Sequence, residues 1–107
     1  DMAKVNNGGN LRIDYVNAHG TSTPVNDKNE SSALIQLFGG IENCPPVTST
    51  KGQIGHCLGA AGTIEAIISI KAMEDGIIPP TINQFENDEN CPLDYVPNKA
   101  RVSKLDV

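Results

Sequence analysis

PPVTSTKGQIGHCLGAAG, residues 45–62, joins a short polar run to a loop that carries a histidine, a cysteine and four glycines. Two prolines, which cannot donate to a β-ladder, enter the run VTSTK, so we predict a short strand over residues 45–51. From about Leu58 to Glu74 the apolar residues recur at helical spacing, and Gly76 is the expected C-cap. The stretch therefore predicts a strand, a glycine-rich turn and a helix.

The preceding part of the chain has the same order. LRIDYVN, residues 11–17, alternates apolar and polar side chains and predicts a strand. Thr23 as N-cap and Pro24 at the first helical position predict a helix to about Phe38, which Gly39 and the next glycine end. One or two short strands are expected after the second helix, and the last ten residues are too short a run to assign. This alternation predicts a single α/β domain over residues 1–107.

Three carboxylates fall on helix faces that should point inward. Asp27 and Glu30 share a face with Leu34, and we interpret them as acceptors for backbone N–H groups and as partners of the helix dipole. Glu65 lies among small and apolar residues of the second helix, opposite Lys71. A buried carboxylate requires a donor or a cation beside it, so a partner for Glu65 is expected.

Composition and charge exclude several classes of function. The chain has a net charge of −5 and only 4% aromatic residues, which argues against a nucleic-acid-binding surface. The longest apolar stretch is interrupted by polar residues, so a soluble protein without a membrane span is expected. An odd set of cysteines without C-x-x-C spacing argues against a disulfide framework and fits a reducing compartment. The cysteines and histidines also lack the close pairs of a structural zinc site.

Both histidines follow predicted strands, where ligands bind in open α/β sheets. His19 and His56, with Lys51 and Glu65 nearby in the sequence, are therefore candidate functional residues. The glycine spacing matches neither a dinucleotide fingerprint nor a P-loop. Cys57 has two open readings, a small hydrophobe at a helix start or a nucleophile with His19 as its base.

Three stretches together resemble a known family: VNAHGTSTPVND, STKGQIGHCLGAAGTIEA and IIPPTIN. In order and spacing they are similar to the C-terminal half of the β-ketoacyl-acyl-carrier-protein synthases, the condensing enzymes of fatty acid elongation. The resemblance runs from about Leu11 to Arg101. It implies the C-terminal half of a thiolase-like layered α/β/α fold.

The resemblance also implies roles for six residues. His19 and His56 would be the catalytic histidines that polarise the malonyl thioester carbonyl, assist decarboxylation and stabilise the enolate. Lys51 would be the active-site lysine and Glu65 its buried acidic partner. The hydroxyls of Thr21 and Thr23 would bind the phosphopantetheine arm of an acyl carrier protein. No tightly bound cofactor is implied.

The family's nucleophilic cysteine and its glycine-rich loop with a phenylalanine gate have no counterpart in this sequence, which begins at Asp1 without a methionine. We therefore expect a fragment that is inactive alone. Its implied partners are acyl carrier protein, the missing N-terminal half and, in the intact enzyme, a second copy, in a bacterial cytoplasm or an organelle such as a plastid or mitochondrion. Two alternatives stay open: a non-catalytic carrier-binding or protein-binding fragment, and a cysteine hydrolase using Cys57 and His19.

Overall fold

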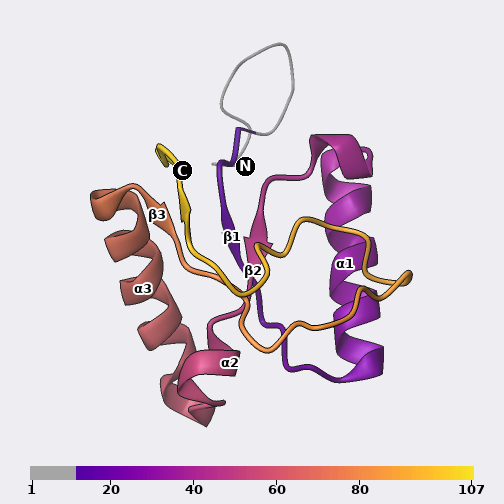
Figure 1. Ribbon diagram of the computed structural model, residues 1–107, viewed down its shortest axis with the longest axis horizontal. Helices are drawn as coiled ribbons and strands as arrows, with labels where there is room; N and C mark the ends of the chain where they lie inside the picture. The colour runs from indigo at the N-terminus through magenta and orange to yellow at the C-terminus, as the bar shows by residue number, and fades with distance from the viewer. Residues whose placement is uncertain (1–11) are drawn as a thin grey trace.

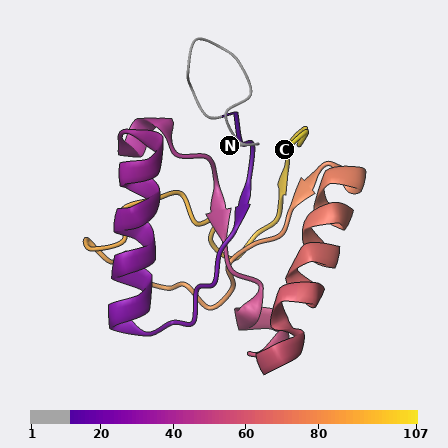
Figure 2. The ribbon, with the colours of Figure 1, turned by 180° about the vertical axis from the view of Figure 1, so that it is seen from behind.

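The computed structural model describes residues 12–107. In chain order its elements are β1 (Val16–Asn17), α1 (Pro24–Phe38), η1 (Ile41–Asn43), β2 (Val47–Thr48), α2 (Lys51–Ile54), η2 (Leu58–Ala60), α3 (Ala61–Asp75), β3 (Ile77–Ile78) and β4 (Arg101–Val102). The short strands lie between the two long helices, with α1 on one side and α3 on the other (Figures 1 and 2). No helix in this part of the chain is long and apolar enough to cross a membrane.

β1 and β2 pair in parallel, with Val16 opposite Val47, and α1 is the crossover between them. The predicted α/β unit is therefore confirmed. Both strands are shorter than predicted. Asp14 donates its N–H to the carbonyl of Val107, away from β2, so the ladder begins only at Val16. Lys51, predicted at the end of a strand, is instead the first residue of α2, and Leu11 lies outside the described residues.

The first long helix has the predicted bounds. Thr23 Oγ1 accepts the N–H of Asn26, and Pro24 occupies the first helical position, where a missing N–H costs nothing. At the other end Gly39 adopts φ 76°, and its N–H donates to Ile35 O. Both ends of α1 are thus determined by local capping chemistry that the sequence displays.

The second long helix starts later than predicted. Leu58 has φ 49°, in the left-handed region, so the predicted start at Leu58 is a 3-10 turn and the α-helix begins at Ala61. Gly76 ends the helix as predicted, with φ 64° and its N–H donated to Ala72 O.

The strands expected after α3 lie at other positions than TIN and LDYV. β3 pairs with β4 in antiparallel fashion, Ile77 opposite Val102, and β4 falls in the last ten residues that the sequence left unassigned. Asn83 and Val96 have φ values of 64° and 48°, which interrupt an extended chain at both predicted places. An isolated bridge pairs Thr81 with Pro97, the residue after LDYV, and the N–H of Thr81 donates to Val96 O.

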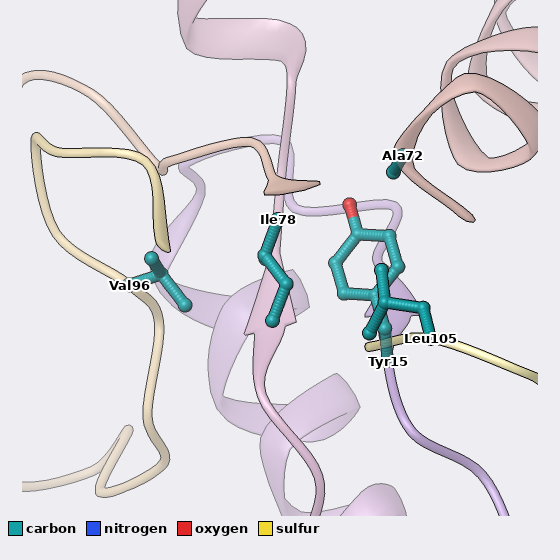
Figure 3. Packing of buried hydrophobic residues seen from close by; sticks show 5 residues of the cluster. All are labelled: Tyr15, Ala72, Ile78, Val96 and Leu105. Atoms are coloured by element: carbon teal, nitrogen blue, oxygen red, sulfur yellow. The ribbon is translucent and has the colours of Figure 1, made fainter. Parts of the chain in front are cut away.

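The core lies under the strands. One cluster contains Tyr15, Ala72, Ile78, Val96 and Leu105, so it joins residues from β1's approach, α3, β3 and the C-terminal segment (Figure 3). Within it the hydroxyl of Tyr15 hydrogen-bonds Thr48 Oγ1 at 2.8 Å. Burial raises the pKa of the Tyr15 phenol, and the nearby Glu65 carboxylate adds to the shift. The core thus reaches the carboxyl end of β2.

Candidate active site

The two histidines lie next to each other although they come from different turns. Their ring centroids are 5.6 Å apart, with the ring planes at 87°. His19 follows β1, and His56 follows α2, which itself begins after β2. Parallel pairing of the two strands therefore brings the turns to one edge of the sheet. Both imidazoles are exposed in this chain.

The carboxylate of Glu30 holds the His19 turn. Its Oε1 accepts the N–H of His19 and its Oε2 accepts the N–H of Gly20, each at 2.8 Å. Asp27 Oδ1 accepts the N–H of Ser22 in the same turn at 3.2 Å. The prediction that these carboxylates serve backbone N–H groups is confirmed. The sequence did not identify which N–H groups donate to these carboxylates, and the N–H of His19 itself is one of them.

Close contact with the end of β2 explains the glycine after His19. Gly20 has φ 42°, and a Cβ added there would lie 2.4 Å from the Cβ of Ser49. Only a residue without a side chain allows this approach. The turn that carries His19 is thus pressed against the residue that follows β2.

A backbone hydrogen bond orients His56. The N–H of Leu58 donates to His56 Nδ1 at 3.1 Å. Because Nδ1 is the acceptor, the neutral imidazole carries its proton on Nε2. His56 can therefore donate a hydrogen bond through Nε2.

Lys51 of α2 and Glu65 of α3 form an ion pair. Lys51 Nζ donates to Glu65 Oε1, and the side chains are 6% and 15% exposed. The expected partner of Glu65 is thus a cation from the first residue of α2. Asn17 Nδ2 donates to Glu65 O and Ser69 Oγ, each at 3.3 Å, and ties this part of α3 to β1. The pair locks α2 against α3.

Thr21 and Thr23 share the turn with His19. Their hydroxyl oxygens are 3.2 Å apart, and Thr23 also caps α1. The structure therefore places both hydroxyls beside the first histidine, and their role in holding a substrate arm stays a prediction.

The thiol of Cys57 contacts backbone carbonyls and not an imidazole. Its Sγ lies 3.7 Å from Ile54 O and 3.9 Å from Gly55 O, both in the α2 turn. Across residues 12–107 no hydrogen bond joins this thiol to either histidine, and no three His, Cys, Asp or Glu side chains gather as a metal site. This geometry favours the reading of Cys57 as a small packed residue.

A cavity of about 690 Å³ lies behind the His19 turn, between α1, the end of β2 and the loop from Thr81 to Tyr95. Gly20, Glu30 and Ser49 are among its lining residues, whereas the histidines are not. Sequence reasoning did not predict this cavity, because residues distant in the chain line it.

Comparison with known proteins identifies the family. A family model described as the beta-ketoacyl synthase C-terminal domain matches residues 2–85. A 3-oxoacyl-[acyl-carrier-protein] synthase 2 of Coxiella burnetii is 52% identical over 89% of this chain and 23% of its own length. Nodulation protein E of a Rhizobium species is 46% identical over 89% of the chain and 24% of its own length.

Solved structures agree. The ishigamide ketosynthase/chain length factor matches with a TM-score of 0.83 and 45% identity over 87% of this chain and 23% of its own. A β-ketoacyl synthase from Burkholderia phymatum matches with a TM-score of 0.80 and 44% identity, over 87% of this chain and 22% of its own. The predicted thiolase-like α/β fold is confirmed. The chain spans about a quarter of the length of these relatives, and it belongs to the β-ketoacyl synthase family as part of the C-terminal domain.

Proposed function

We propose that this chain is part of a β-ketoacyl-acyl-carrier-protein synthase that condenses malonyl-acyl carrier protein with an enzyme-bound acyl thioester. The main observation that supports this proposal is the His19–His56 pair, whose ring centroids lie 5.6 Å apart. The chain that carries the pair is 52% identical to part of a 3-oxoacyl-[acyl-carrier-protein] synthase 2. Fatty acid elongation is the favoured role because that relative, at 52% identity, is more similar to this chain than the ketosynthases of actinorhodin and tetracenomycin polyketide synthesis from Streptomyces species, at 45% and 46%.

In the proposed mechanism both imidazoles donate to the malonyl thioester oxygen. The malonyl carboxylate leaves as CO₂, and its electron pair forms the enolate, whose negative charge the two donors stabilise. The enolate carbon then attacks the acyl thioester carbonyl, and the enzyme's thiolate leaves. The proton on His56 Nε2, fixed by the hydrogen bond from Leu58, supports this assignment of the donor atom.

The ion pair and the threonines have supporting roles. Lys51 and Glu65 would hold the second histidine turn at a fixed position and supply a positive charge near the site. Thr21 and Thr23, which present adjacent hydroxyls beside His19, would bind the phosphopantetheine arm of the carrier protein. One solved relative is a ketosynthase in complex with its type II polyketide synthase acyl carrier protein, which makes a carrier protein a reasonable partner here.

We also propose that the nucleophilic cysteine lies on polypeptide outside these 107 residues. Three apolar side chains of α3, Ile67, Ile70 and Met73, are 56%, 52% and 41% exposed. Such a stripe on a long helix is typical of a covered interface, and further polypeptide of the same enzyme is the natural cover.

The test compares the full-length polypeptide that contains this chain with the chain alone. Each is incubated with acyl- and malonyl-acyl carrier protein, and the β-ketoacyl product is measured. Product from the full-length polypeptide and none from the chain alone is expected. Carrier binding without turnover in both would favour the non-catalytic alternative, and release of free acid by the chain alone would favour the cysteine hydrolase.

A further inference from the structure

Ser49 occupies a fixed position between the two histidine turns. It directly follows β2, and the residue is 9% exposed. Its backbone N–H donates to Thr81 Oγ1 at 3.1 Å, so the residue is held from the side of the C-terminal loop. This hydrogen bond fixes the backbone of Ser49 and so restricts the position of its side chain.

The hydroxyl of Ser49 contacts both turns. Oγ donates to the carbonyl of Gly20, directly after His19, at 2.9 Å. The same oxygen accepts the N–H of Lys51, the first residue of α2, at 3.4 Å. Because α2 leads to His56, one hydroxyl links the backbone segments that carry the two imidazoles.

The surroundings leave little freedom for a substitute. A Cβ on Gly20 would overlap the Ser49 side chain, so the two segments are already in direct contact. Removing the hydroxyl would leave the Gly20 carbonyl and the Lys51 N–H without this partner, in a place with little access to bulk water. The packing of Gly20 against residue 49 would persist, whereas the two histidine turns would be less firmly fixed relative to each other.

We propose that Ser49 is a positioning residue that sets the placement of His19 relative to His56. This inference rests on the proposed function, in which both imidazoles act on one oxygen atom. It follows that Ser49 affects decarboxylation, which needs both imidazoles at once, more than acyl loading. Misplacement of reacting groups by about 1 Å costs up to about 100-fold in rate, which bounds the expected effect.

The test uses Ser49→Ala in the full-length polypeptide. The kcat of malonyl decarboxylation should fall about 10- to 100-fold, while KM and the rate of acyl loading change less than about twofold. Ser49→Cys, which keeps a weak donor of similar size, should recover part of the rate. If Ser49→Ala does not yield folded protein, the same selective loss is sought in Ser49→Cys.

Ser31→Ala is the matched control. Ser31 is 4% exposed, and its hydroxyl bonds Asp27 O within α1 and Tyr95 OH in the C-terminal loop at 2.6 Å, rather than a backbone group of either histidine turn. It should leave the ratio of decarboxylation to loading unchanged. An equal loss of both steps in the Ser49 variants, or no loss, would overturn the inference. His19→Ala or His56→Ala retaining decarboxylation would instead overturn the proposed function.

Discussion

Replacing Glu65 by alanine should destabilise the enzyme strongly, because it leaves the charge of Lys51 buried without a partner. The Lys51 side chain is 6% exposed and that of Glu65 15%. Removing one member of a buried pair costs about 3–5 kcal/mol, whereas replacing both members by apolar residues of similar size is often neutral or stabilising. The double variant Lys51→Met/Glu65→Leu should therefore recover most of the lost stability, although not the activity.

Urea denaturation of the full-length polypeptide, followed by circular dichroism, measures these changes. Glu74→Ala is the control on the same helix, since its partner Lys71 is 58% exposed and Glu74 is 59% exposed. The control should shift the urea midpoint far less, because solvent screens that pair. A Glu65→Ala midpoint equal to that of Glu74→Ala, or a double variant no more stable than Glu65→Ala, would refute the reasoning.

Three further results are expected. Glu30→Gln, which retains one acceptor for two backbone N–H groups, should lower malonyl decarboxylation about tenfold with acyl loading little changed; equal effects on both rates would contradict the role of this carboxylate. Tyr15 has a folded pKa raised by burial above its unfolded value of about 10, so its contribution to stability is present below that pH and lost as pH rises through the folded pKa. As pH rises from about 10 through the folded pKa of Tyr15, the urea midpoint should fall less steeply for Tyr15→Phe than for the unsubstituted protein. Identical slopes for the two proteins would contradict a raised pKa of Tyr15. Gly20→Ala should abolish decarboxylation or folding because its Cβ would overlap Ser49, and a crystal structure of an active variant with an undisturbed turn would disprove this.

Local chemistry made much of the fold predictable. The bounds of α1 follow from Thr23, Pro24 and Gly39, each of which acts within a few residues of its own position. The partial burial of Glu65 was predictable for a similar reason, because helical spacing assigns it to a face with Ala61 and Ala72, which are buried.

Long-range contacts and local backbone conformation explain the errors. Leu58 adopts a left-handed conformation that delays α3, and nothing in a leucine indicates this. β4 forms because Arg101 and Val102 pair with β3, and its two residues are too few to show a periodic pattern. The short length of β1 is associated with a hydrogen bond from Asp14 N–H to Val107 O, and no local sequence pattern indicates this bond.

The candidate site divides in the same way. The histidines could be predicted, because each follows a strand signal in a turn rich in small residues. The contacts that arrange them could not be predicted, since Glu30 and Ser49 reach the His19 turn across the tertiary structure. For Glu30 the sequence did contain a signal, because it is an inward-facing carboxylate in the helix that follows the His19 turn. Nothing in the sequence around Ser49 indicated its contacts.

The histidine pair is the central claim, and one measurement tests it most directly. In the full-length polypeptide, malonyl decarboxylation and acyl loading are measured separately for His19→Ala and His56→Ala, with Lys104→Ala, whose side chain is 85% exposed, as control. Each histidine variant should lose about 100- to 1,000-fold in decarboxylation, as expected for a lost oxyanion donor, and should still accept the acyl group. Decarboxylation that survives in either histidine variant while acyl loading is lost would contradict the account.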